Sequence, residues 1–194
     1  MSKIILLLLL CQSLFLVACT NITPKGPVIT TQLLLEERRS REVILSDRMI
    51  EAEAYSELNS DHKLRELCHV NINAFNGTVL ITGEAANEEL SKNIITIIQG
   101  ISNVKLVHNN LSIDYPADSA TRNNDELITE GVKTALSKIH TIPDFYPSMI
   151  KVITENNVVY LMGLVHSEEG TIAINITKLQ PGIKEIVTVF EYID

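Results

Sequence analysis

The sequence predicts an α+β fold in which one small unit occurs twice. Residues 69–113 and 149–192 have the same order: an alternating run, a tight turn, an apolar run ending in glycine, an amphipathic stretch and a second alternating run. Alignment of the two turns places Gly83 on Gly163. A matched order of segments at a fixed spacing is typical of a duplicated structural unit. Each unit is too small to bury a large core alone, so we expect the two to pack against each other.

The 194-residue chain is acidic, with 24 Asp and Glu residues against 16 Lys and Arg residues and a formal net charge of −8. Proteins that bind nucleic acid take much of their affinity from neutralising phosphates, so this balance argues against a nucleic-acid partner. The same balance opposes general binding to anionic membranes.

The amino terminus has the pattern of a lipoprotein signal peptide. Lys3 precedes an apolar run over residues 4–17, which suits a signal peptide and is short for a membrane span with flanks. The run ends in Leu16-Val17-Ala18-Cys19, which resembles the bacterial lipobox. We therefore expect a signal peptide over residues 1–18, with covalent diacylglycerol and N-acyl groups on Cys19 and no other cofactor. The alternative is an ordinary secretory signal with a chance cysteine.

Residues 19–40 are predicted to form a lipidated tether. Pro24, Gly26 and Pro27 lie in a polar stretch that disfavours regular structure. The residue after Cys19 is Thr20 rather than Asp, which resembles enterobacterial lipoproteins that are sorted to the outer membrane. We expect a protein that is lipid-anchored in the outer membrane, faces the periplasm and has no spanning segment after residue 19.

Cysteine usage predicts no intramolecular disulfide. The mature chain keeps Cys19 and Cys68, and lipidation of Cys19 leaves Cys68 without a partner. We expect Cys68 to be a small buried hydrophobic residue.

The first unit is predicted over residues 41–114. Its first helix is placed at about 46–59, with Ser46 or Asp47 as the N-cap. Asn76-Gly77 predicts a hairpin turn, because both residues tolerate positive φ. The remaining elements are strands at 70–74, 79–82 and 104–113 and a helix at about 88–99 that follows Asn87.

Arg38, Arg39 and Arg41 form a basic cluster just before the first unit. Acidic residues surround the cluster, so we predict a solvated charged face. The alternative is contact with anionic head groups near the tether.

The second unit is predicted over residues 125–194, after a polar linker at 115–124. Asp125 is predicted to cap a helix at about 126–139. Ser167 is predicted to cap the second helix, ahead of two acidic residues that suit its dipole. The strands are predicted at about 149–155, 158–164 and 183–193.

Two glycines are assigned a structural role. Gly83 and Gly163 each stand in the second predicted strand of a unit, where a backbone bend or close packing leaves no room for a side chain.

The residues with reactive side chains form no catalytic or metal-binding pattern. The five histidines lack metal-ligand spacing, and there is no nucleophile elbow or phosphate-binding loop. The glutamate pairs at 88–89 and 168–169 are explained by helix starts. We therefore expect a protein that is not an enzyme and has no metal site and no small-molecule substrate.

The repeated α-β-β-α-β unit resembles the BON domain, which is named for bacterial osmotic-stress and nodulation proteins. The clearest motifs are Asn73-Ala74-Phe75-Asn76-Gly77 running into Val79-Leu80, and Thr154-Glu155-Asn156 running into residues 160–165 (YLMGLV). With a lipobox and a tether, the whole chain resembles the outer-membrane lipoproteins that carry two BON domains. The resemblance implies two tandem domains, each with two helices packed on a three-stranded mixed sheet.

This resemblance also implies a function in outer-membrane integrity and, for some members, a place at the division site. It implies contact with anionic phospholipid through the first helix of the second unit. The membrane-inserting aromatic of the family falls on Leu127 and a basic position falls on Gly131, while Lys133 keeps one charge and two glutamates add negative charge. The candidate membrane or partner contacts are Leu127, Ile128, Gly131, Val132 and Lys133.

Two other interpretations of the sequence stay open. Leu127, Ile128 and Val132 are equally well explained by core or inter-domain packing. At the level of function, the alternatives are a periplasmic scaffold for an envelope protein, such as outer-membrane assembly machinery, and an osmotic-stress protein without an anchor.

Overall fold

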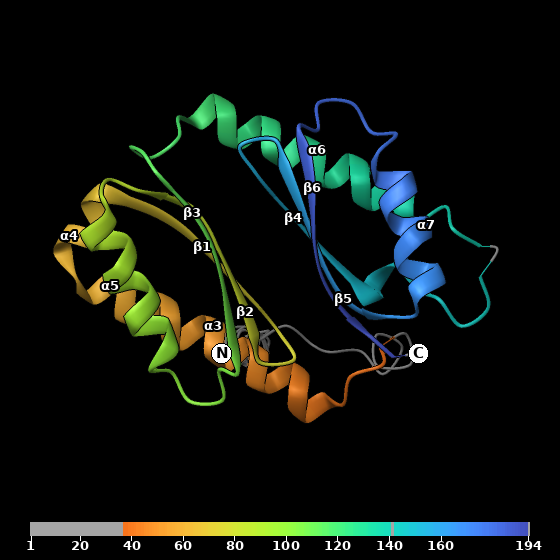
Figure 1. The fold of residues 1–194 in the computed structure, drawn as a ribbon, viewed down its shortest axis with the longest axis horizontal. Coiled ribbons are helices and arrows are strands. Elements are labelled where there is room, and N and C mark those ends of the chain that lie inside the picture. Colours follow the sequence, from red (N-terminus) through yellow and green to blue (C-terminus); the bar gives the residue numbers. More distant parts are fainter. Residues whose placement is uncertain (1–36, 141, 194) are drawn as a thin grey trace, which may run out of the picture.

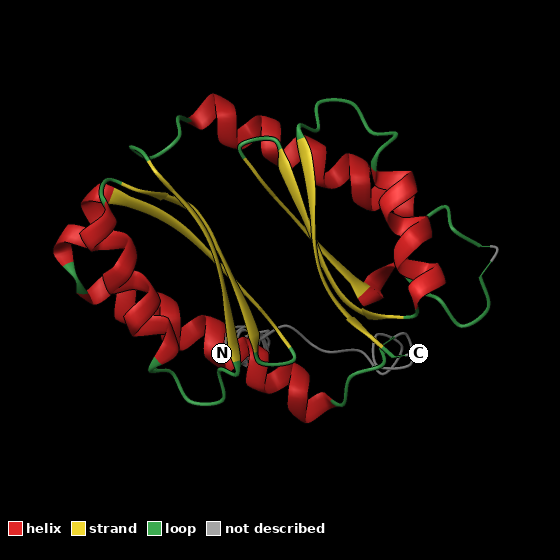
Figure 2. Ribbon diagram, viewed as in Figure 1, coloured by secondary structure: helices red, strands yellow, loops and turns green. Residues whose placement is uncertain are grey.

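The computed structural model describes residues 37–140 and 142–193. Two domains of the same architecture lie side by side, each with its helices on the outside and its sheet facing the other domain (Figure 1). The layers are therefore helix, sheet, sheet, helix (Figure 2). The predicted signal peptide, Cys19 and most of the predicted tether lie outside the described residues.

The first domain has three helices and three strands. Its second helix was not predicted and lies where the chain turns back toward the sheet. The elements are α3 (Arg41–Ser60), α4 (His62–Leu67), β1 (Cys68–Phe75), β2 (Thr78–Ala85), α5 (Glu88–Gln99) and β3 (Leu106–Ile113).

The second domain repeats this order, with a short 3-10 turn in the place of α4. The elements are α6 (Ser119–Leu136), η1 (Pro147–Met149), β4 (Ile150–Glu155), β5 (Val158–Val165), α7 (Ser167–Thr177) and β6 (Glu185–Tyr192).

Both sheets have the same mixed topology, with the second strand of the domain in the centre. β1 pairs antiparallel with β2, and β2 pairs parallel with β3. β4, β5 and β6 pair in the same way. The predicted α+β class and the two helices on a three-stranded mixed sheet are thus confirmed.

Each sheet buries one face under its own helices. Alternate strand residues point to this face, as the period of two requires. In the first domain the core includes Ile50, Ala54, Val79, Ile81, Ile94 and Ile98, and in the second domain it includes Ile128, Val132, Leu136, Val159, Leu161 and Ala173.

The other faces of the two sheets pack against each other. A third apolar cluster lies between the domains and is formed by Phe75, Leu80, Ile153, Tyr160 and Met162. Polar pairs surround it: Asn76 donates to Glu191 at 2.7 Å, and Lys151 pairs with Glu51 at 2.5 Å. The expected packing of one unit on the other is therefore present.

The two structural glycines lie in the central strands. Gly83 of β2 is opposite Val70 of β1, and Gly163 of β5 is opposite Ile150 of β4. A Cβ at Gly83 would collide with the backbone carbonyl of His69, and Gly83 has a φ of +111°. A Cβ at Gly163 would lie 2.8 Å from the carbonyl oxygen of Met149. Both glycines therefore let the first strand approach the central strand closely.

Both long helices begin earlier than predicted. The N-caps are Ser40 for α3 and Asp118 for α6, and their side chains accept from backbone N–H groups of the first turn. The predicted linker residues 119–124 accordingly lie inside α6. Asp47 and Asp125 cap no helix, because their carboxylates accept from the hairpin turns instead.

The end of the predicted tether joins the two domains. Arg38 donates to both carboxylate oxygens of Glu169, each at 2.6 Å, and to the carbonyl oxygen of Leu164 at 3.0 Å. Arg39 lies 3.7 Å from the centroid of the Phe75 ring and pairs with Asp47 at 2.9 Å. The predicted solvated face was therefore wrong for these two arginines. Arg38 pairs with a residue of the other domain, and Arg39 pairs with Asp47 of α3.

The described residues contain no helix that combines the length and the apolar character needed to cross a bilayer. Where the described chain begins, before α3, it lies at the edge of the molecule opposite α6 (Figure 1).

Candidate functional site

Helix α6 carries all five predicted contact residues, and the structure divides them between the core and the surface. Ile128 and Val132 are buried, with 6% and 0% of their surfaces exposed. Both belong to the core of the second domain. Their assignment as membrane or partner contacts is therefore corrected: they hold α6 to its sheet.

Leu127 is the apolar predicted contact residue that reaches the surface, with 73% of its area exposed. It projects from the outer side of α6, since a step of one residue turns the helix by about 100° away from the buried Ile128. The other large apolar residues of α6 (Ile128, Val132 and Leu136) are buried, so the exposed Leu127 has no role in the core of this domain.

Gly131 is one helical turn after Leu127, and because it has no side chain the backbone of α6 is uncovered there. The nearest atom to a Cβ at this position would be Oε1 of Gln180, at 3.9 Å. The glycine is therefore not required by a close neighbour. Lys133 is half exposed and pairs with Glu130 at 3.0 Å.

A shallow depression of about 360 Å³ opens beside Leu127. We call it the Leu127 depression. The loop between α7 and β6 forms its other wall with Gln180, Pro181 and Gly182. The same loop carries Leu179, 79% exposed, and begins and ends with the exposed lysines Lys178 and Lys184. Exposed apolar side chains and two exposed lysines therefore occur on α6 and on the loop that flanks the Leu127 depression.

The glutamates of α6 line a different groove. Glu126, Thr129, Glu130 and Lys133 lie along one side of a cavity of about 360 Å³ between α6 and the first domain. His69 and Glu155 are also among its lining residues. We call it the inter-domain groove. Glu126 and Glu130, whose negative charge would oppose contact with anionic lipid, thus line this groove.

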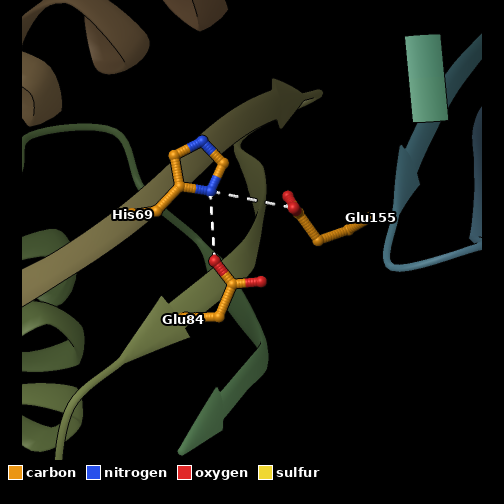
Figure 3. Close-up of side chains that lie close together, drawn as sticks. All are labelled: His69, Glu84 and Glu155. Atoms are coloured by element: carbon orange, nitrogen blue, oxygen red, sulfur yellow. Dashed lines mark ion pairs between the residues drawn. The ribbon is translucent and has the colours of Figure 1, made fainter. Parts of the chain in front are cut away.

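His69, Glu84 and Glu155 meet beside the inter-domain groove (Figure 3). They come from β1, β2 and β4 and so from both domains. Nδ1 of His69 lies 3.3 Å from Glu84 Oε2 and 3.7 Å from Glu155 Oε1. The two carboxylates are almost fully buried, with 2% and 6% of their side chains exposed.

Sequence spacing missed this cluster because Glu155 belongs to the other sheet and lies far along the chain from the paired residues His69 and Glu84. The one available signal was the alternation of the strands, which puts His69 and Glu84 on the face away from their own helices. Nothing in the sequence showed that this face meets Glu155.

The BON domain family profile matches residues 46–115 and again residues 124–194. Two tandem domains with the same mixed sheet and the same helix order are the arrangement that this match describes. The chain belongs to the BON domain family.

Two relatives align with much of the chain. The outer membrane lipoprotein DolP of Haemophilus influenzae is 26% identical over 189 residues, which are 97% of this chain and 96% of that protein. The 21 kDa hemolysin of Actinobacillus pleuropneumoniae is 25% identical over 155 residues, which are 80% of this chain and 78% of that protein.

One solved structure that partly aligns with this chain is the C-terminal domain of CdsD, the structural protein of the type III secretion system of Chlamydia trachomatis. It aligns with 76% of this chain and 67% of that chain at a TM-score of 0.30 and 12% identity.

Proposed function

We propose that this protein is a lipid-anchored, non-enzymatic protein of the outer membrane that faces the periplasm and supports the integrity of the envelope. Diacylglycerol and an N-acyl group on Cys19 would hold it at the membrane, and the Leu127 depression would contact phospholipid. The relative named as an outer membrane lipoprotein, which aligns with nearly the whole chain, supports this location.

The observation that carries the lipid contact is the exposure of Leu127 in a depression that Pro181 also lines, next to a loop that exposes Leu179. Transfer of one leucine side chain out of water is worth about 1.5–3 kcal/mol. A lysine near an anionic surface adds about 1 kcal/mol. Contacts of this size are weak alone, and an acyl anchor makes them effective because it keeps the domain at the surface.

The orientation of α6 weakens the electrostatic argument that its glutamates oppose contact with anionic lipid. Glu126 and Glu130 line the inter-domain groove, and Glu130 is paired with Lys133. The α7–β6 loop, which forms the other wall of the Leu127 depression, has exposed Lys178 and Lys184 at its ends.

Vesicle binding tests the lipid contact. The chain from Thr20 to Asp194 should co-sediment with phosphatidylglycerol vesicles, and Leu127→Glu should weaken binding about tenfold or more through the lost apolar burial. Leu45→Glu, at an exposed leucine of α3, is the matched control and should bind as the parent does. Equal binding by the Leu127→Glu variant would contradict the proposal, as would loss of binding on Leu45→Glu alone.

Metabolic labelling tests the anchor. Cells grown with a labelled fatty acid should incorporate it into the parent chain and not into the Cys19→Ala variant. Lack of label in the parent would favour the alternative of an osmotic-stress protein that needs no anchor.

A second candidate is contact with an envelope protein, and the net charge of −8 favours it over anionic lipid. A photo-crosslinking amino acid in place of Leu127 separates the two in cells. Adducts with lipid support the first proposal. A discrete protein adduct, lost when the crosslinker is moved to Leu45, would replace it with a scaffold function.

A further inference from the structure

The side chains of His69, Glu84 and Glu155 converge on one point between the domains (Figure 3). One atom from each residue can be chosen so that all three atoms lie within 4.8 Å of one another. Ligands about 2.0–2.1 Å from a tetrahedral cation lie about 3.3 Å apart. The distances from His69 Nδ1 to the two carboxylates, 3.3 and 3.7 Å, are close to this spacing.

Neighbouring groups hold both carboxylates in place. Glu84 is held through both oxygens, since the backbone N–H of Ala117 donates to Glu84 Oε2 at 3.1 Å, whereas Glu155 is held through Oε2. Asn71 Nδ2 donates to Glu155 Oε2 at 2.8 Å, and Thr82 Oγ1 donates to the same oxygen at 3.3 Å. Asn156 Nδ2 donates to Glu84 Oε1 at 2.6 Å. Glu84 Oε2 and Glu155 Oε1 are the carboxylate oxygens that face the imidazole of His69. Contacts of this kind orient the ligands of metal sites.

Nδ1 of the His69 imidazole points toward the two carboxylates and makes no hydrogen bond. Nδ1 of His69 is buried and is the one buried side-chain nitrogen or oxygen of the described residues that lacks a hydrogen bond. Its neighbour Gly83 contributes to this position, because the His69 carbonyl packs where a Cβ would be. A buried polar atom without a partner needs an explanation such as a bound ion or water.

The charges at the cluster also call for a cation. Within the described residues, the ion pairs of Glu84 and Glu155 involve no base other than His69. Two buried carboxylates beside a single imidazole form a site that a bound cation would stabilise.

We propose that His69 Nδ1, Glu84 Oε2 and Glu155 Oε1 bind a divalent cation of the zinc class. Imidazole nitrogen together with carboxylate oxygen suits zinc, whereas magnesium and calcium prefer oxygen ligands alone. The inter-domain groove, lined by His69 and Glu155, gives the ion a path from solvent. Because His69 and Glu84 belong to the first domain and Glu155 to the second, the ion stabilises the docked arrangement of the two.

The test uses the full chain in detergent, stripped of metal with a chelator and titrated with zinc chloride in a calorimeter. We expect one zinc ion per chain and a higher Tm in its presence. His69→Ala and Glu155→Gln should each weaken zinc binding by more than about 100-fold, beyond the 10–100-fold that loss of an outer contact costs. Asn71→Ala removes such an outer contact and should weaken binding about 10-fold.

His62→Ala is the matched control. His62 lies 3.4 Å from Glu66 on an exposed helix, so it pairs with a carboxylate outside the cluster. Zinc affinity should be unchanged in this variant. The Tm of each metal-free variant shows that it is folded, and Glu155→Gln preserves the shape of the side chain if His69→Ala does not fold.

Three results would overturn the proposal. They are absence of a binding heat with the parent chain, zinc affinity unaffected by both His69→Ala and Glu155→Gln, and equal loss of affinity with His62→Ala. Magnesium chloride that competed equally with zinc would contradict the assignment of the zinc class.

Discussion

Asp125 accepts hydrogen bonds from the backbone N–H groups of Asn156 and Asn157, each at 2.8 Å, and so fixes helix α6 to the hairpin turn of its own sheet. Asp47 makes the same two contacts, also at 2.8 Å, with Asn76 and Gly77 in the first domain. The duplication therefore preserved a specific hydrogen-bonding device as well as the order of the elements.

Asp125→Ala should destabilise the protein by about 2–4 kcal/mol, because two hydrogen bonds to a charged group are lost and the turn N–H groups lose their partner. Urea unfolding followed by circular dichroism measures the change. Glu126→Ala, at the exposed neighbouring position of the same helix, should have a much smaller effect. An equal effect of the two substitutions would show that the turn does not depend on Asp125.

The pair of Arg38 and Glu169 predicts a pH dependence. Burial raises the pKa of Glu169, but the hydrogen bonds and charge of Arg38 outweigh it and hold the pKa below its ordinary value of 4.5. The unfolded chain then binds the proton more readily, so the pair stabilises the fold above pH 4.5 and this stabilisation is lost as the pH falls through the lower folded pKa.

Arg38→Met removes the pair and should lower stability at neutral pH. The difference between the parent and the variant in urea unfolding should be largest at pH 6–7 and should shrink below about pH 4. A difference that stayed constant across this range would mean that Arg38 acts through packing alone.

Gly83→Ala should be strongly destabilising, since the added Cβ would collide with the His69 carbonyl and the residue has a positive φ. Gly131→Ala is the opposite case. Its Cβ has ordinary space, so replacing a glycine inside a helix should stabilise the protein by up to about 1 kcal/mol. Thermal unfolding of the two variants checks both signs.

Leu80→Ala should destabilise the contact between the domains rather than either core. Leu80 is fully buried in the inter-domain cluster, and truncation of a buried leucine costs about 2–5 kcal/mol. If the domains unfold together in the parent, this variant should separate their transitions or broaden the single one. Leu45→Ala, at an exposed leucine, should leave the unfolding profile unchanged.

The local elements could be predicted from the sequence because their signals are local. Asn76-Gly77 predicts a turn through its positive φ values, and Asn87 caps α5 at the predicted position. The starts of α3 and α6 were missed for a definite reason. Asp47 and Asp125 resemble N-caps because they accept backbone N–H groups, and the sequence does not show that those groups belong to a distant turn.

The site divides in the same way. The outward direction of Leu127 follows from helical periodicity once the buried side of α6 is known, but Ile128 and Val132 could be assigned to the core only from the structure. The pairing of Arg38 with Glu169 and the meeting of His69 with Glu155 depend on the contact between the domains. Composition and spacing carry no information about such contacts.

The edge at which the described chain begins has a consequence for how this protein would stand on a bilayer. α6 lies along the opposite edge, so a lipid at Cys19 and a contact at Leu127 can both be satisfied only if the intervening chain passes alongside the two domains (Figure 1). Residues 19–36 can extend to about 60 Å at most. The length of the tether, more than its sequence, would decide which side of the protein faces the lipid.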